Sequence, residues 1–423
     1  ESESLQFLLF YELIIALSIL AGGVTLVHNI ARRVRIRVPS GSFFRLPKIR
    51  WHSGHGYGFT TALAIGLGAT LGSPLFILIP LNVLQYGVIS IASLLLAAAI
   101  SFSIARLYAR MFREWNEKGK DCTDGPSFTK NACGRVSLRY FIARFGMWIG
   151  NTALAAYSLI ISANYARFGF FNTLRSLVSL GILENVVTGL IIALLAAWFL
   201  VNAFFEKRYA RTIAVAQIAL TVILCGILIF ETALLAGTGN RPIDSLLTPS
   251  SIDASGLVFA LITNTAFLFL LFFGFQEIQA LSSDLAPKSS VPGLAFLSRF
   301  KDMDRVRFAK YAMLGSVSIA TIINIAYAVG VYIASPDPNS VAQASIPAVY
   351  ISRTMFGPWN GLLIAFAFII ASLTTFVPAY LASSRHLQWL SSDGFFPRVV
   401  GKSAWLFSLL FIVVLSLFNA GFL

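Results

Sequence analysis

The chain has 423 residues, of which 57% are hydrophobic and only 12% are charged. Soluble globular proteins carry about 25% charged residues, so this composition excludes a soluble enzyme, a secreted disulfide scaffold and a disordered protein. The net charge of +14 would suggest nucleic acid in a soluble protein, but in a membrane protein it first reflects loop topology. We therefore expect an all-α integral membrane protein, surrounded by lipid, that is not an enzyme and binds no nucleic acid.

Apolar stretches of bilayer length recur along the whole chain. A membrane-spanning helix needs about 20 mostly apolar residues, and about ten such stretches are present. The predicted spans, in chain order, are 5–27, 57–82, 84–108, 140–164, 182–204, 210–236, 256–283, 310–334, 359–384 and 404–423.

The lysines and arginines indicate which loops are cytoplasmic. If the loop after the first span is cytoplasmic, every Lys and Arg except Arg167, Arg175, Arg241 and Arg353 lies in or beside a cytoplasmic loop. Such a bias is the positive-inside rule. It predicts a multi-pass protein of the cell membrane, with the N-terminus outside and the basic loops in the cytoplasm.

The second predicted span contains an interruption at residues 65–76, IGLGATLGSPLF. Its glycines loosen the backbone, and Pro74 removes a hydrogen-bond donor and clashes with the preceding turn. We predict a break near residues 71–73, which a membrane tolerates only inside protein or beside a polar cavity. The alternative is close packing of Gly68 and Gly72 against another helix.

The span at 256–283 contains a second interruption, LFFGFQEIQALSSDLAP at residues 271–287. Gly274 lies among phenylalanines, and Glu277 follows at membrane depth. A carboxylate there is costly unless it is paired or faces water, so Glu277 is a functional candidate. The alternative is that Glu277 is hydrated near the inner interface.

The two interruptions fall in the first and sixth core spans if the most N-terminal span is an extra helix. Discontinuous helices at matching positions of two halves indicate a secondary transporter built from inverted repeats. The predicted organisation is an extra N-terminal helix (1–30), a basic linker (31–56), a first repeat (57–236) and a second repeat (256–423). The second repeat is incomplete, because no tenth core helix is visible.

Four segments resemble the amino acid–polyamine–organocation (APC) transporter superfamily, which has the leucine-transporter-type fold of five plus five inverted helices. Residues 66–76 are similar to the family's G-x-G-x-x-x-G-S-G-I-F, and the polar loop 125–134 to the segment that leads into its third helix. Residues 274–287 resemble its G-F-[D/E] and E-E-V-x-N-P motifs, and residues 382–397 its A-x-S-R and D-G-x-x-P motifs.

The resemblance implies a substrate site where the two broken helices meet. Backbone N–H groups of Gly72 and Ser73 would bind a carboxylate, and Phe275 would cover the substrate. Backbone carbonyls would bind an amine. These carbonyls would belong to Ala69, Thr70, Phe272 and Phe273.

The chain departs from the family at two positions of this site. Pro74 stands where the family has a glycine and has no N–H, and Gln276 stands where the family has an acidic residue. Tyr157, in the middle of the third core helix, is a further candidate contact, because that helix flanks the site in the family.

The sequence is compatible with more than one coupling ion. Proton-coupled members can use a Lys in the fifth helix, but residues 212–230 contain none. Sodium-coupled members bind the ion between first-helix carbonyls and eighth-helix hydroxyls, for which the counterparts here are Ser372, Thr374 and Thr375. Oxygen ligands suit such a hard cation, although membrane hydroxyls also bond to their own helix. Glu277, as a proton carrier, is a third option, and exchange without a coupling ion is a fourth. No other cofactor is expected.

The predicted function is alternating-access transport of an amino acid, amine or related small organic solute by a permease or exchanger. The alternative is a non-transporting structural or scaffold subunit derived from an APC transporter. Pro74, the missing tenth helix and the extra N-terminal helix, which could face a protein partner, favour this alternative.

Overall fold

The computed structural model describes residues 57–120, 124–174, 206–242, 254–282, 285–290, 301–334, 336–344 and 346–419. The spans predicted at 5–27 and 182–204 and the linker at 31–56 lie outside these residues. The described chain is almost entirely helical, apart from the short hairpin of β1 (Lys288–Ser289) and β2 (Met303–Asp304). The predicted all-α class is confirmed.

Six helical segments of the described part are long and apolar enough to cross a membrane, and one bent pair makes a seventh. The six are α4 (Val88–Glu117), α6 (Leu138–Leu174), α8 (Glu206–Gly237), α11 (Arg305–Ala334), α14 (Pro358–Ser392) and Gly256–Ala280, which contains most of α9 (Ala254–Leu268) together with η2 (Phe269–Phe272) and α10 (Glu277–Ala280). The bent pair is α2 (Phe59–Thr70) and α3 (Leu75–Tyr86). A shorter apolar helix, α16 (Ala404–Asn419), follows. These elements occur in the predicted order, so the chain is a multi-pass membrane protein.

Several helices extend beyond their predicted ends. α4 continues to Glu117 instead of ending near residue 108, and α14 continues to Ser392 instead of residue 384. The prediction followed apolar residues only, whereas charged side chains also favour helix and pair along it. The Arg110–Glu114 pair, with Nε and Oε1 2.8 Å apart, supports the extension of α4.

The segment 125–134 was predicted as a loop, and this prediction is wrong. Gly125–Cys133 forms helix α5, whose N-terminal cap is Asp124. The Asp124 carboxylate accepts a hydrogen bond from the backbone N–H of Ser127 at 2.9 Å, and Pro126 lies in the first turn, where its missing N–H is harmless. The other short helices are α12 (Pro338–Ala342), α13 (Pro347–Phe356) and α15 (Arg398–Lys402).

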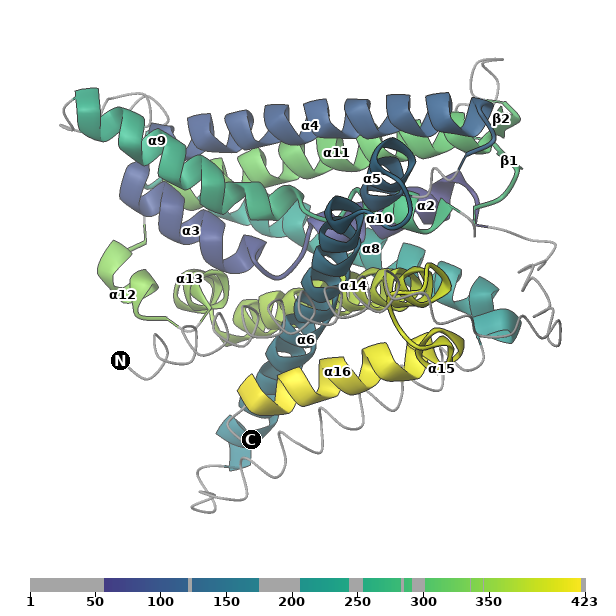
Figure 1. Cartoon of the computed structure of the whole chain (residues 1–423). Helices are drawn as coiled ribbons and strands as arrows, with labels where there is room; N and C mark the ends of the chain where they lie inside the picture. The colour runs from purple at the N-terminus through teal and green to yellow at the C-terminus, as the bar shows by residue number, and fades with distance from the viewer. Residues whose placement is uncertain are drawn as a thin grey trace, which may run out of the picture.

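The long helices run between two ends of the bundle (Figure 1). α4 and α11 lie side by side, while α6 crosses α14 and packs on α16. We call the end that holds α5, α15 and the hairpin the α5 end, and the end that holds α12 and α13 the α13 end.

Arg144 of α6 is fully buried at the α5 end within a cluster of polar side chains. Its guanidinium donates hydrogen bonds to Asp124 and, at 2.8 Å, to the hydroxyl of Ser127, and it lies 4.4 Å from the centre of the Trp389 ring. The Nδ1 atom of His386 lies 3.3 Å from both Arg144 and Asp124. This cluster joins α5, α6 and α14.

Asp393, which follows α14, extends the cluster to the surface. It accepts a hydrogen bond from Tyr140, whose hydroxyl also accepts one from Arg144 at 3.3 Å. Lys130 and Arg135 form ion pairs with the Asp393 carboxylate at 3.0 and 2.8 Å. Asp124 and Asp393 therefore each have a cationic partner.

Candidate functional site

The first core span breaks between α2 and α3, where the sequence predicts it. α2 ends at Thr70, α3 begins at Leu75, and the two helices are bent by 51°. The backbone N–H groups of Gly72 and Ser73 form no hydrogen bond with any described residue, whereas that of Leu71 donates to Leu67 at 2.8 Å. The break therefore leaves two adjacent donors available for a ligand.

The sixth core span breaks at Phe273 and Gly274. Phe273 is extended, and Gly274 has φ of +135°, a backbone conformation that side chains other than glycine rarely adopt. The Gln276 side chain folds back and accepts a hydrogen bond from the Gly274 N–H at 3.1 Å. Helix resumes at Glu277, so the break spans about one turn of backbone.

The two breaks lie against each other. A Cβ atom on Gly274 would lie 2.5 Å from the Ala69 Cβ and 3.0 Å from the Thr70 backbone nitrogen. Only a residue without a side chain allows this approach. Two segments separated by about 200 residues of sequence thus share one point, as inverted-repeat transporters require.

Two glycines of α2, and Gly72 in the break, also pack closely against other helices, so the break and the packing interpretations both hold. A Cβ on Gly66 would meet Ile278 of α10 at 2.5 Å. Cβ atoms on Gly68 and Gly72 would meet Thr374 and Thr375 of α14 at 2.9 and 3.0 Å. The spacing of Gly68 and Gly72 reflects a shared helix partner.

Most of the predicted substrate-site residues are buried around the two breaks. The buried ones are Ala69, Thr70, Gly72, Ser73, Phe272, Phe275 and Gln276. Phe273, at 38% exposed, is the most open residue of the two breaks. The Ser73 hydroxyl has no hydrogen-bond partner among described residues, whereas the Thr70 hydroxyl donates to Gly66 and Leu67 of its own helix.

Tyr157 differs from these residues in its position. It lies on α6, which packs on α14, α16 and α5, and its side chain is 37% exposed. Among the described residues, no side-chain hydrogen bond or ring contact joins it to either break.

Two of the three predicted cation ligands meet the first break. The hydroxyls of Thr374 and Thr375 donate to the Gly68 carbonyl at 3.1 and 3.4 Å and to the Ala371 carbonyl at 3.1 and 2.8 Å. The Ser372 hydroxyl instead donates to Phe368 of its own helix at 3.0 Å. Four oxygen atoms therefore gather between α2 and α14, without Ser372.

Gln217 and Thr221 of α8 complete this contact, and the sequence reasoning missed both. Gln217 Nε2 donates to the Thr374 carbonyl at 3.0 Å, and Thr221 donates to Ala64 at 3.2 Å. Pro378 has no N–H and therefore leaves the Thr374 carbonyl, four residues earlier, without its helical donor. In the sequence, Pro378 therefore indicates that a donor from another helix is needed for the Thr374 carbonyl, although it does not identify Gln217 as that donor.

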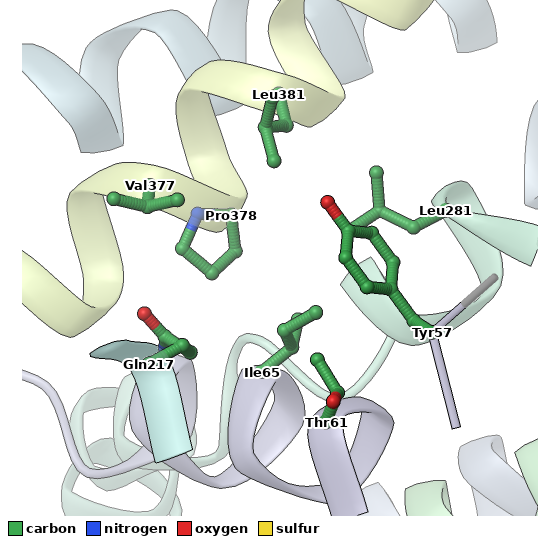
Figure 2. Close-up of a pocket in the computed structure, with 8 residues that line it drawn as sticks. All are labelled: Tyr57, Thr61, Ile65, Gln217, Leu281, Val377, Pro378 and Leu381. Carbon is green, nitrogen blue, oxygen red and sulfur yellow. The ribbon is translucent and has the colours of Figure 1, made fainter. Parts of the chain in front are cut away.

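One small cavity lies on the α5 side of this region. A cavity of only about 10 Å³, the space of one water molecule, lies between α2, α8 and α14. Figure 2 shows Gln217 and Pro378 together on one side of it, with Tyr57 and Leu281 on another. The start of α2 is also fastened to the chain after α10, because the Ala286 N–H donates to the Tyr57 carbonyl at 2.9 Å.

Glu277 is the acidic residue nearest the breaks in sequence. It is 1% exposed, and neither carboxylate oxygen has a hydrogen-bond partner among described residues. Asp124 and Tyr108 are close enough to interact with it electrostatically. Its neighbour Phe275 packs edge-on against the Tyr108 ring, with the ring centres 6.5 Å apart.

A helical membrane protein whose first and sixth core spans break and touch has the architecture of a secondary transporter with inverted repeats. The chain belongs to the amino acid permease family, which matches residues 57–415. This membership confirms the resemblance to the APC superfamily and the transporter class.

Solved structures support the same fold. The substrate-bound, outward-open state of a Na⁺-coupled sialic acid symporter aligns with a TM-score of 0.54 and 14% identity, over 87% of this chain and 76% of that chain. A variant of the Eremococcus coleocola manganese transporter aligns with a TM-score of 0.51 and 12% identity, over 85% and 69%. At these identities the likeness concerns the fold alone. No curated protein sequence gives a significant match.

Proposed function

We propose that this chain is a secondary transporter that carries an amino acid, amine or related small organic solute by alternating access. The observation that supports the proposal is the contact of the two breaks at Gly274 and Ala69. In this proposal the α5 end faces the cytoplasm, and the α13 end faces outside.

The breaks would supply both halves of a zwitterion site. Helix-terminal N–H groups favour anions, so those of Gly72 and Ser73 would bind a carboxylate. The carbonyls of Ala69, Thr70, Phe272 and Phe273 would bind an amine, with Phe275 and Gln276 beside them. Pro74 offers no third donor, which favours amines and small zwitterions held by few carboxylate contacts.

Counterflow in proteoliposomes with a labelled panel of amino acids and amines tests this function. We expect saturable uptake of at least one solute by the native chain and loss of that uptake in Gly274→Ala, because a Cβ there collides with Ala69. Gly226→Ala is the matched control, since a Cβ on Gly226 would meet nothing within 4 Å. Absence of uptake of every solute by folded protein would favour the scaffold alternative.

For the coupling ion, we propose Na⁺ bound between α2 and α14. The oxygens of Gly68, Ala371, Thr374 and Thr375 form a hard-ligand set of the kind that sodium prefers. Replacing both threonines by valine should abolish stimulation by a Na⁺ gradient, while Ser372→Ala should retain it. Glu277 is the rival site: stimulation by a pH gradient, lost in Glu277→Gln, would assign coupling to a proton.

A further inference from the structure

Glu231 is a buried carboxylate of α8 that the transport proposal does not use. Its side chain is 0% exposed. Oε2 accepts a hydrogen bond from Asn360 Nδ2 at 2.7 Å, while Oε1 has no partner among the described residues. An ionised carboxylate in such a place is strongly unfavourable unless a cation balances it.

Among the described residues, the helices around Glu231 place no such cation beside it. Arg385 and His386 of α14 lie toward the other end of that helix from Asn360. α2 carries no titratable side chain. α11 contributes the hydroxyl of Tyr327, which is 1% exposed and interacts with Glu231 electrostatically. On α13, Arg353 is exposed and forms no ion pair with Glu231, and within the described chain neither does any other Lys, Arg or His. A proton is therefore the simplest way to neutralise this carboxylate.

A single amide group links Glu231 to two other helices. Nδ2 of Asn360, at the start of α14, donates both to Glu231 and to the Ser352 hydroxyl, each at 2.7 Å. Ser352 lies on α13 and is fully buried. Because α13 also packs on α3, the outer half of the broken span, its position bears on access to the breaks from the α13 end.

We propose that Glu231, Asn360, Ser352 and Tyr327 form a proton-binding site, and that a proton on Glu231 holds α13 against the bundle. Release of the proton to water leaves an unbalanced negative charge. Hydration of that charge then separates α13 from α8 and α14. This site is distinct from the proposed solute and sodium sites, and its test needs no substrate.

Infrared spectroscopy of the full chain in lipid at neutral pH tests the protonation state. A protonated carboxyl has a carbonyl stretching band that is separate from the bands of a carboxylate. We expect Glu231→Gln to remove such a band. Glu277→Gln, which changes another buried membrane carboxyl, is the control and should leave the Glu231 band in place. Loss of carboxylate bands in Glu231→Gln would show an ionised Glu231 and overturn the proposal.

Cysteine reactivity tests the link to α13. Ala348 of α13 is 1% exposed, and Thr354 of the same helix is exposed. In protein with Cys122, Cys133 and Cys225 replaced by serine, Ala348→Cys reports opening, and Thr354→Cys corrects for the reagent's own pH dependence.

We expect the ratio of the two labelling rates to rise several-fold from mildly acidic to mildly alkaline buffer, with a membrane-impermeant maleimide. Added Glu231→Gln should keep the ratio low at every pH. A ratio that does not change with pH in the parent protein, or that changes equally with Glu231→Gln, would overturn the link. If Ala348→Cys does not fold, the infrared result still decides the protonation state.

Discussion

The two ends of the bundle bury the acids Asp124 and Glu231, and the contacts that balance these two carboxyl groups differ. At the α5 end, Asp124 pairs with the fully buried Arg144, and Asp393 pairs with Lys130 and Arg135. At the α13 end, the described hydrogen-bond partners of the Glu231 carboxylate are the neutral side chains of Asn360 and Ser352. A guanidinium keeps its charge at any physiological pH, so the ion pair of Arg144 with Asp124 persists over that range. Neutralisation of Glu231 by a proton, in contrast, depends on the pH.

The largest expected effect is the loss of Arg144. Arg144→Met leaves Asp124 buried without its cation, which should lower the free energy of unfolding by about 3–5 kcal/mol. Denaturant unfolding in detergent, followed by circular dichroism, measures this. Adding Asp124→Asn should recover part of the loss, because the unbalanced charge is then removed.

The control for this prediction is Arg110→Met. Arg110 pairs with Glu114 at 2.8 Å, but the two side chains are 75% and 45% exposed. Exposed pairs contribute less than about 1 kcal/mol. If Arg110→Met and Arg144→Met lowered the free energy of unfolding equally, the buried cluster would not stabilise the α5 end as its geometry suggests.

A smaller effect is expected at the other end. Glu231→Gln should change the free energy of unfolding by less than about 1 kcal/mol, because glutamine still offers an oxygen to Asn360 and adds no charge. Asp124→Asn, the same chemical change at the α5 end, should be several-fold more destabilising. The free energies of unfolding of both variants, measured at one pH and in one detergent, test this difference between the two ends. Similar losses of stability would contradict it.

The sequence predicts features that depend on local chemistry. The Gly and Pro pattern of residues 65–76 locates the first break, and Gly274 among aromatic residues locates the second. Both follow from backbone rules that hold wherever a helix lies. The fold class and the order of the spans follow in the same way from apolar length and loop charge.

Contacts between distant helices could not be predicted. Thr374 and Ser372 are chemically similar, yet residues two apart face different sides of a helix, and only the packed structure shows that Thr374 faces Gly68. The same limit hid Gln217, which lies 157 positions from the Thr374 carbonyl that it caps. Asp124 was overlooked for another reason, since its segment was predicted as a loop and its role as a helix cap was missed.

The smallest expected effect concerns α12, at the same end as Glu231 but outside the spans. The Asp337 carboxylate accepts hydrogen bonds from the Ser340 hydroxyl at 2.6 Å and from its N–H at 3.0 Å, and these hold the pKa of Asp337 below its usual range. Because the folded pKa lies below the unfolded value of about 3.9, the cap is present above that pH and is lost as the pH falls through the folded pKa.

Hydrogen exchange of the first amides of α12, relative to Asp337→Ala, which removes the cap, should therefore show protection that disappears only in acid. Acid should have the opposite effect at Glu231, because a proton on this carboxyl keeps α13 packed against α8 and α14. An acid titration that loosened α12 and α13 together would show that the two acids act as one unit, and would remove the distinction between the surface cap and the buried proton site.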